Sequence, residues 1–264
     1  MKQRTEERHL KVGDFMSSPV VTVRPDTNFV DAVQLMILKG IGNLAVVEGE
    51  KVDGIITERE LLQHLVLNKT VPNKQVRYVM TQKFTKVTPE TSVVDAAKTM
   101  ISKKARLLVF QKDRRTGADQ LAGIITASDI VVAFLQTDRN PSIESVMTNR
   151  IFALKPGNTI LASAKLMLKK GIGSVVVSAN ASPYAIFTER DLLKRVLGEH
   201  VDIEDKVGSY CTRPVLTARL GIGAKDAAKI MFSRKIKRLP LTKGGKVVAM
   251  VTARDLVEAF QRGS

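Results

Sequence analysis

Four segments of the chain share one pattern, and this internal repeat constrains the fold more than any other feature. Each segment opens with a five-residue start motif that begins with Val or Ile. The fifth positions are 64, 67 and 64 residues apart: Met16, Met80, Met147 and Cys211. Each segment closes with Gly or Ala, two apolar residues, Thr, two more residues and an acid, at 54–60, 123–129, 185–191 and 249–255. An apolar stretch of helical period follows every closing motif. The sequence therefore predicts an array of four similar units.

The order of elements within a unit follows from the spacing of apolar residues in the first segment. Residues 20–23 are mostly β-branched and predict a strand, residues 25–27 predict a turn and helix start, and apolar residues recur at helical spacing from Phe29 to Ile37. Residues 44–47 and 52–56 predict two strands joined by a hairpin at 48–51, and Thr57 opens the last helix. The predicted fold class is α/β, with four β-α-β-β-α repeats.

A longer period indicates that a pair of repeats was duplicated. Residues 39–42 (Lys-Gly-Ile-Gly) recur at 170–173, and 102–104 (Ser-Lys-Lys) resemble 233–235 (Ser-Arg-Lys), both 131 residues on. The predicted organisation is a polar tail at 1–11, a first pair at 12–139 with repeats 12–69 and 76–136, and a second pair at 140–264 with repeats 143–198 and 207–261.

The closing motifs and the Arg-Leu-Pro-Leu strand at 238–241 resemble the cystathionine-β-synthase (CBS) domain family, over about residues 12–260. The resemblance implies that two repeats pack through their sheets into a pseudo-twofold pair with nucleotide clefts. Two such pairs form a disk, as in the γ subunit of AMP-activated kinase. The implied ligand is AMP, ADP or ATP, with Mg²⁺ on the triphosphate, and S-adenosylmethionine is the alternative. The implied role is a regulatory sensor that signals to an effector protein.

The closing Thr-x-x-Asp motif has two readings. It can form a capping box, in which Thr accepts a backbone N–H of the first helical turn and the acid reaches back. It can also bind a ligand, with the acid on the ribose and Thr near a phosphate at the helix N-terminus. Asp is shorter than the Glu that suits a capping box, and Arg beside the positive end of a helix dipole requires an anion. Both details favour ligand binding.

The resemblance implies a binding set drawn from all four closing motifs. Its members are Thr57, Arg59 and Glu60; Thr126, Ser128 and Asp129; Thr188, Arg190 and Asp191; and Thr252, Arg254 and Asp255. Glu60 departs from the family Asp, which weakens the expected ribose contact there. Basic residues expected at the phosphates are Arg106, Lys237 and Arg238, found by counting six or seven positions from the helix methionines. Expected adenine contacts are Ile55, Ile124, Ile186, Met250, Thr27 and Thr91, although core packing explains the apolar ones equally well.

Composition argues against catalysis and leaves one rival function open. His9, His64 and His200 lack metal-ligand spacing, Cys211 stands where other repeats have Met, and Gly-x-Gly occurs without the strand and helix that a dinucleotide site needs. We therefore expect no catalytic residue and no metal site. The net charge of +16, with +5 on residues 1–139 and +11 on 140–264, implies an anionic partner, and nucleic acid is the rival ligand. Aromatic residues make up only 5% with no Trp, so stacking platforms for single strands are scarce.

Compartment and assembly are constrained only broadly. No apolar run approaches the roughly 20 residues that span a bilayer. The N-terminal residues lack a signal-peptide core, and a lone cysteine excludes an internal disulfide framework. We expect a cytoplasmic protein without membrane contact, as a monomeric disk or a homodimer. A scaffold that binds a protein partner is the third alternative.

Overall fold

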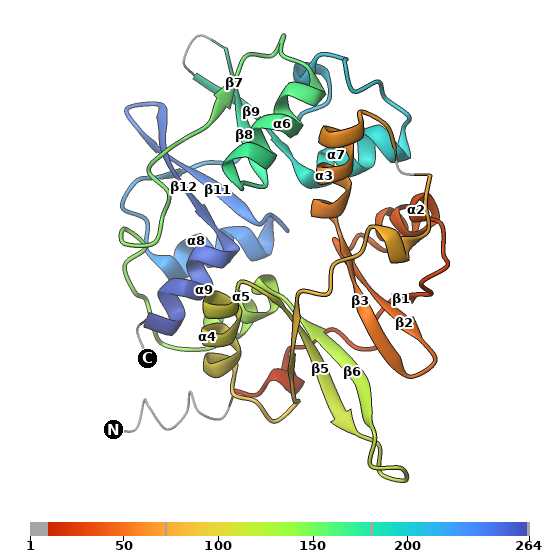
Figure 1. The fold of residues 1–264 in the computed structure, drawn as a ribbon. Helices are drawn as coiled ribbons and strands as arrows, with labels where there is room; N and C mark the ends of the chain where they lie inside the picture. The colour runs from red at the N-terminus through yellow and green to blue at the C-terminus, as the bar shows by residue number, and fades with distance from the viewer. Residues whose placement is uncertain (1–9, 72, 180–181, 263–264) are drawn as a thin grey trace. The chain divides into compact units, whose positions relative to one another are not determined.

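The structure is a computed structural model that describes residues 10–71, 73–179 and 182–262, so the predicted tail and His9 lie almost wholly outside the described residues. The β-α-β-β-α order is confirmed in every repeat (Figure 1). Repeat 1 comprises β1 (Thr22–Val23), α2 (Phe29–Lys39), β2 (Asn43–Glu48), β3 (Lys51–Thr57) and α3 (Glu58–Asn68). Repeat 2 comprises β4 (Phe84–Val87), α4 (Val93–Lys103), β5 (Arg106–Lys112), β6 (Asp119–Ile125) and α5 (Ala127–Leu135).

The second half of the chain repeats this order. Repeat 3 comprises β7 (Ala153–Leu154), α6 (Ile160–Lys170), β8 (Ser174–Ala179), β9 (Ser182–Thr188) and α7 (Glu189–Leu192), which continues as the π-helical segment η3 (Leu193–Gly198). Repeat 4 comprises β10 (Ala218–Arg219), α8 (Ala224–Ser233), β11 (Arg238–Lys243), β12 (Lys246–Thr252) and α9 (Ala253–Arg262). The predicted α/β class is confirmed.

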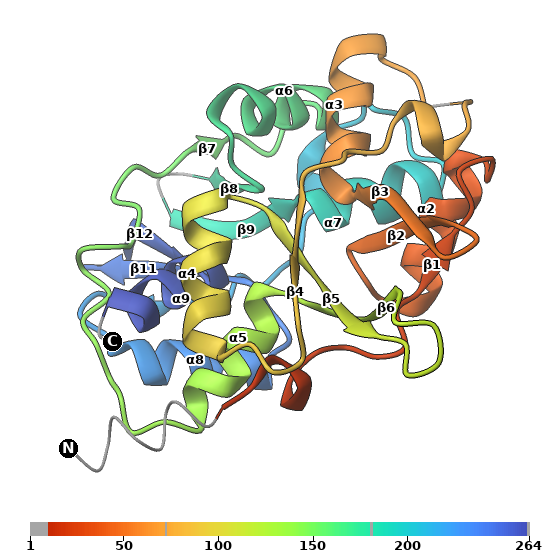
Figure 2. The same cartoon turned by 60° about the horizontal axis from the view of Figure 1, so that its bottom comes forward.

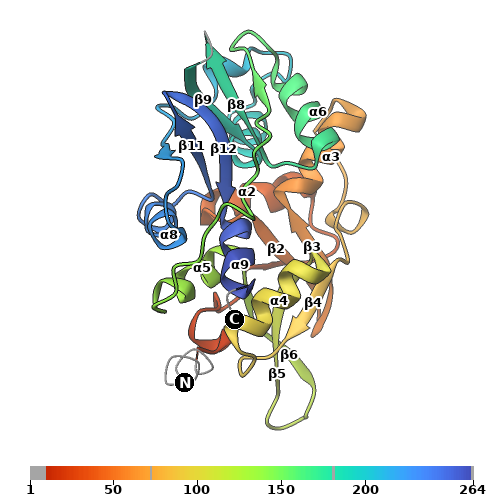
Figure 3. The ribbon, with the colours of Figure 1, turned by 90° about the vertical axis from the view of Figure 1, so that its left-hand side faces the viewer.

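Each repeat builds one three-stranded sheet of mixed direction. The first strand pairs in parallel with the second, and the second pairs antiparallel with the third, as in β1-β2-β3. The antiparallel hairpins β8–β9 and β11–β12 are clear in Figure 3. The loop predicted at 48–51 is the β2–β3 turn, where Gly49 has a φ of +60°, a conformation that glycine adopts without steric cost.

The chain divides into two compact units that each combine two repeats distant in sequence. Unit 1 comprises 1–20, 83–150 and 217–264, and therefore contains the elements of repeats 2 and 4. Unit 2 comprises 21–82 and 151–216, with the elements of repeats 1 and 3. In unit 1, α4 packs on α9, and α5 packs on both α8 and α9 (Figure 2). In unit 2, α3 packs on α6 and α7, and α2 packs on η3. The grouping of sequence-adjacent repeats into pairs stays a prediction.

The two faces of each hairpin have different surroundings. Ile125 and Val251 face the helices and belong to the core of unit 1, as Ile56 and Phe187 belong to the core of unit 2. Because side chains alternate along a strand, the residues just before them lie on the opposite face. The four residues expected to contact adenine occupy that opposite face of their hairpins.

The start motifs are exchanged between neighbouring repeats, which the sequence did not predict. Val12 N–H donates to Thr91 O of repeat 2 at 2.9 Å, and Val76 N–H donates to Thr27 O of repeat 1 at 2.8 Å. Likewise, Val207 N–H donates to Asn158 O of repeat 3 at 2.8 Å. Val12, Val76 and Val207 are wholly buried. Each of these start motifs therefore completes the core beside another repeat's first helix.

Candidate functional site

The closing motifs lie where the third strand of each repeat becomes its last helix, and all four form capping boxes. In repeat 2, Thr126 N–H and Thr126 Oγ1–H donate to Asp129 Oδ2 at 2.7 and 2.8 Å. In repeat 4, the same groups of Thr252 donate to Asp255 Oδ2 at 2.8 and 2.9 Å. Thr188 with Asp191 and Thr57 with Glu60 form the equivalent boxes. The capping reading is thus confirmed for every copy.

One argument made from the sequence is wrong. Asp was expected to be too short for a good capping box, yet the aspartate oxygens lie 2.7–2.8 Å from the threonine amides. The extended backbone at the N-cap, with φ −114° and ψ 171° at Thr126, brings the amide close enough. Capping uses one carboxylate oxygen, Oδ2, and leaves Oδ1 outside the box. Capping and ligand binding are therefore compatible in one aspartate.

Burial perturbs both motif carboxylates of unit 1. Burial raises the pKa of Asp129, although Thr126 and the ammonium group of Lys237 act to lower it. Burial likewise raises the pKa of Asp255. In unit 2, Oδ1 of Asp191 instead accepts a hydrogen bond from Thr212 Oγ1 at 3.0 Å. A group that donates to Oδ1 of Asp129 or Asp255 would favour the charged carboxylate and offset its burial.

The residue that begins the second strand stands beside the motif threonine. Arg238 lies opposite Thr252, Asn43 opposite Thr57, and Ser174 opposite Thr188. In repeat 2, Leu107 lies opposite Ile125, so Arg106 is the residue beside Thr126. Arg106 is therefore structurally equivalent to Arg238.

This register corrects the count made from the helix methionines. That count equated Leu107 with Arg238 and Arg106 with Lys237. Repeat 2 has one residue fewer between its helix and strand, because β5 begins only two residues after Lys104, the C-cap of α4, which has a φ of +49°. In repeat 1, Gly40 holds that left-handed position and β2 begins three residues later.

Three cations predicted at the phosphates gather in unit 1. Arg106 and Arg238 occupy equivalent positions in its two repeats, and Lys237 precedes Arg238. Lys237 of repeat 4 acts to lower the pKa of Asp129 of repeat 2, so a cation of one repeat acts on the closing motif of the other. Lys237 O also accepts the N–H of Ala253, the first residue of α9, at 2.9 Å.

Arg254 has a structural partner that the sequence did not indicate. Its Nη2 donates to Met100 O at 3.2 Å and to Ile101 O at 3.3 Å, near the end of α4. The carbonyl end of a helix carries partial negative charge and attracts cations. An Arg at the start of α9 is therefore compensated by the end of α4, without a bound anion.

In unit 2, the anion expected beside each motif arginine is a glutamate of the chain itself. Arg59 Nε of α3 lies 2.9 Å from Glu189 Oε1 of α7. Arg190 Nε of α7 donates to Glu58 Oε1 of α3 at 3.1 Å. The two ion pairs cross between the helix starts of repeats 1 and 3. The Ser128 position in repeat 2 carries no charge.

The remaining predicted residues are buried or occupied in turns. Ile55 is wholly buried, and Ile124, Ile186 and Met250 are 7–9% exposed. Thr91 Oγ1 accepts the N–H of Thr88 at 3.0 Å, and Thr27 N–H donates to Arg24 O at 3.1 Å. Both threonines directly precede the N-caps of their helices, Asn28 and Ser92, so each helix begins later than the start predicted at the threonine.

Sequence reasoning missed the segments that follow the start motifs. They pair as isolated antiparallel bridges with the four apolar residues: Ser17 with Ile124, Thr81 with Ile55, Thr148 with Met250, and Thr212 with Ile186. Each segment brings a hydroxyl residue to the hairpin that carries the closing motif. The Thr-x-Pro or Ser-x-Pro spelling at 17–19 and 212–214 was the available sequence signal.

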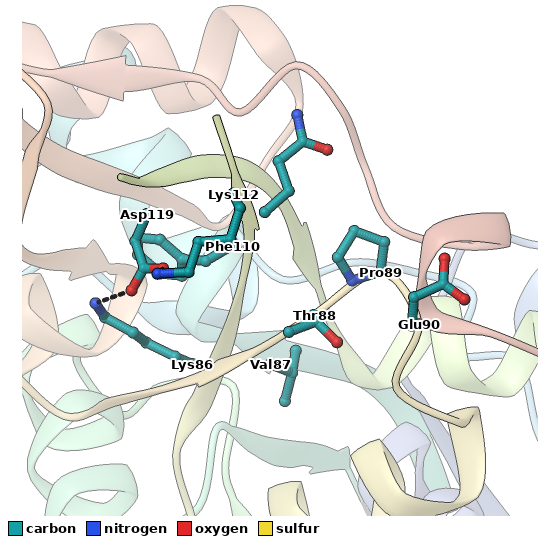
Figure 4. Close-up of a pocket in the computed structure, with 9 residues that line it drawn as sticks. Lys86, Val87, Thr88, Pro89, Glu90, Phe110, Lys112 and Asp119 are labelled. Atoms are coloured by element: carbon teal, nitrogen blue, oxygen red, sulfur yellow. Dashed lines mark hydrogen bonds and ion pairs between the residues drawn. The ribbon is translucent and has the colours of Figure 1, made fainter. Parts of the chain in front are cut away.

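A pocket of about 510 Å³ lies elsewhere in unit 1 (Figure 4). The end of β4 and the β5–β6 hairpin form it, and none of the predicted site residues lines it. Lys86 Nζ lies 4.5 Å from the centre of the Phe110 ring, and Lys86 and Lys112 lie 3.4 and 2.8 Å from Asp119. Asp119 therefore forms ion pairs with both lysines of the pocket.

The described residues contain no group of three His, Cys, Asp or Glu side chains placed to hold a metal ion. Burial lowers the pKa of His64 in α3 and raises the pKa of the Cys211 thiol, which disfavours a reactive thiolate. Over the part of the chain that the structure describes, no helix is both long and apolar enough to cross a bilayer.

Comparison with known proteins identifies the class. A model of the CBS domain matches residues 12–67, 76–136, 143–198 and 207–262, so the chain belongs to the CBS-domain family. The uncharacterized protein MJ1404 of Methanocaldococcus jannaschii is 28% identical over 94% of this chain. The chain spans 61% of that relative's length.

Two solved structures share the fold along nearly the whole chain. Protein MJ1225 of M. jannaschii, described as a candidate archaeal homologue of g-AMPK, has a TM-score of 0.81 at 22% identity, with 95% of this chain and all of that chain covered. An uncharacterized conserved protein of Pyrococcus horikoshii has a TM-score of 0.66 at 19% identity, with the same coverage. These likenesses confirm the four-repeat fold.

Proposed function

We propose that this chain is a non-catalytic regulatory protein that binds an adenine nucleotide in unit 1. Arg106, Lys237 and Arg238 hold the phosphates, while Asp129 and Asp255 accept hydrogen bonds from ribose hydroxyls. The CBS family supports the adenine ligand, and AMP, ADP, ATP with Mg²⁺ and S-adenosylmethionine are the compounds to compare. The predicted signal to an effector protein belongs to this proposal.

The observation that carries the proposal is the placement of equivalent arginines beside two capping boxes. Arg106 adjoins the start of α5 and Arg238 adjoins the start of α9. Helix N-termini offer backbone N–H groups to phosphates, and a guanidinium group can bind a phosphate through two parallel hydrogen bonds. The residue after the motif threonine is Ala127 or Ala253, so the glutamate that stands at this position in repeats 1 and 3 is absent from both repeats of unit 1.

The same geometry allows a sugar contact beside each capping box. Oδ1 of Asp129 and of Asp255 lies outside the box, and both side chains are partly buried, which raises the pKa of their carboxyl groups. Two ribose hydroxyl donors would replace the water that burial removes. Ligand binding would then relieve a cost that the free protein carries.

Calorimetric titration with ATP, ADP, AMP and S-adenosylmethionine tests the proposal. Removal of both guanidinium groups in R106A/R238A should weaken ATP binding at least about tenfold, because hydrogen bonds to charged groups contribute about 1.5–3 kcal/mol each. R114A/R115A removes the same charge from the exposed β5–β6 loop and should leave ATP affinity unchanged. Equal weakening by both variants would indicate nonspecific attraction to the net charge.

The nucleic-acid alternative has one favouring observation, the net charge of +16. The logarithm of the association constant for a duplex should then fall linearly with the logarithm of the salt concentration. It should also fall equally for R106A/R238A and R114A/R115A, which distinguishes it from a nucleotide site.

A further inference from the structure

Units 1 and 2 differ systematically at two positions around the closing motif. The residue after the motif threonine is Glu58 or Glu189 in unit 2, and alanine in both repeats of unit 1. The residue before the second strand is Gly42 or Gly173 in unit 2, where repeat 4 has Lys237 and repeat 2 has Ala105. Both repeats of unit 2 therefore combine an acid with glycine, whereas unit 1 combines alanine with lysine in repeat 4 and alanine with alanine in repeat 2.

The two changes are coupled in space. A Cβ atom added to Gly42 would lie 3.0 Å from Glu58 Oε1 and 3.1 Å from its Cδ. Glu58 N–H also donates to Gly42 O at 3.3 Å, and Glu189 N–H donates to Gly173 O at 3.1 Å. The Glu58 carboxylate thus occupies the space that the Cβ atom of a larger residue at position 42 would need.

The glutamates are buried and matched to arginines of the opposite repeat. The side chains of Glu58 and Glu189 are 15% and 10% exposed, and those of their partners Arg190 and Arg59 are 35% and 30% exposed. Two positive and two negative charges cancel at the facing helix starts of α3 and α7. Asn43 and Ser174, the equivalents of Arg106 and Arg238, add no charge.

We propose that Glu58 and Glu189 act as built-in anions that occupy Arg59 and Arg190, exclude nucleotide phosphate from unit 2, and so confine nucleotide binding to unit 1. This inference rests on the proposed function for its ligand. A phosphate entering unit 2 would meet two carboxylates and would have to displace both from their arginines. Unit 2 is then a fixed support whose helices α3 and α7 are held by the crossed ion pairs.

A gain-of-binding experiment tests the assignment. R106A/R238A, which removes the phosphate ligands of unit 1, is combined with E58Q/E189Q, which keeps the side-chain shape and frees the charge of both arginines. Calorimetry with ATP and with pyrophosphate should show at least about tenfold tighter binding to the quadruple variant than to R106A/R238A alone. The reason is that phosphate can then form charge-assisted contacts with Arg59 and Arg190. No gain by this folded variant would overturn the inference.

A second variant decides the matter if the first does not fold. E58Q/R59M/E189Q/R190M removes all four charges together, so it leaves no unpaired buried charge and should fold. It should bind ATP with the affinity of the unaltered protein, and a tenfold weakening would overturn the inference. If the unaltered protein binds no ATP, the proposed function fails. Pyrophosphate binding gained by E58Q/E189Q would then still support the inference, and its absence would overturn it.

Discussion

The ammonium group of Lys237, just before β11, influences the carboxyl group of Asp129 at the start of α5, although 108 residues separate them in sequence. Burial raises the pKa of that carboxyl group, and Lys237 acts in the opposite direction. Repeat 4 thus supplies a cation to the closing motif of repeat 2, which makes unit 1 a shared electrostatic environment.

Replacement of Lys237 by Met should weaken ATP binding by about tenfold, because one charge-assisted phosphate contact is lost. The same change should raise the pKa of Asp129 further, because its nearby cation is gone. Calorimetry measures the first effect and carboxyl NMR titration the second. K246M, at the exposed first residue of β12, is the matched control and should change neither.

Asp255 serves both the helix cap and the proposed ribose contact, and two substitutions separate these roles. D255A should lower the free energy of unfolding by about 0.5–2 kcal/mol, because Thr252 loses the partner of its capping box. D255N keeps an acceptor oxygen and should retain most of the stability while ATP affinity falls. Urea unfolding and calorimetry distinguish them. Unchanged ATP affinity in both variants would show that Asp255 caps the helix and does not contact the ribose.

The buried carboxyl groups predict a pH dependence of defined sign. Burial raises the pKa of Asp129 and Asp255 above the ordinary 3.8, so the folded state binds more protons than the unfolded state just above that value. Their contribution to stability therefore falls as pH rises through the raised values. D129N/D255N has no carboxyl group to ionise at these positions. The difference in stability between this variant and the unaltered protein should therefore shift in favour of the variant as pH rises from below 3.8 to neutral. A difference in melting temperature that does not vary with pH would contradict this.

The same titration should affect the ligand in the opposite direction. A protonated carboxyl group is a weaker acceptor for ribose hydroxyls, so ATP affinity should decline as pH falls through the raised pKa values of Asp129 and Asp255. The decline should be shallower for D129N/D255N, which has no carboxylate to protonate. Identical pH profiles of ATP affinity for the variant and the unaltered protein would show that neither carboxyl group affects ATP binding.

Arg254 should be important for stability rather than for nucleotide affinity. Its contacts with Met100 O and Ile101 O place it at the end of α4, where cations contribute typically 0.3–1 kcal/mol. R254M should lower the melting temperature by roughly 1–4 °C, at about 2–4 °C per kcal/mol for a chain of this size. Its ATP dissociation constant should stay within threefold of the original value. R262M, which removes an arginine from the exposed end of the same helix, is the matched control.

The sequence predicted what local patterns determine. The fourfold spacing, the hairpin at Gly49 and the helix starts at Thr57 and Thr126 depend on neighbours within a few positions, and all were confirmed. The predicted register of Arg106 was wrong by one residue. Counting from the helix methionine assumes loops of equal length, but the loop after Lys104 is one residue shorter than the loop after Gly40.

Contacts between repeats lay beyond the sequence. The Arg190–Glu58 pair joins residues 132 positions apart, and each side chain alone reads as an ordinary charge at a helix start. Exchange of the start motifs, such as Val76 onto repeat 1, likewise depends on tertiary packing rather than on local pattern. The start motifs are exchanged in both units, whereas the Arg190–Glu58 and Arg59–Glu189 pairs belong to unit 2.

The most direct test is a crystal structure with ATPγS, located by anomalous scattering from the sulfur of its terminal thiophosphate. The account predicts one or more sulfur peaks within contact distance of Arg106, Lys237 or Arg238, and none beside Arg59 or Arg190. Sulfur peaks at the arginines of unit 2, or only in the pocket beside Lys86, would contradict it.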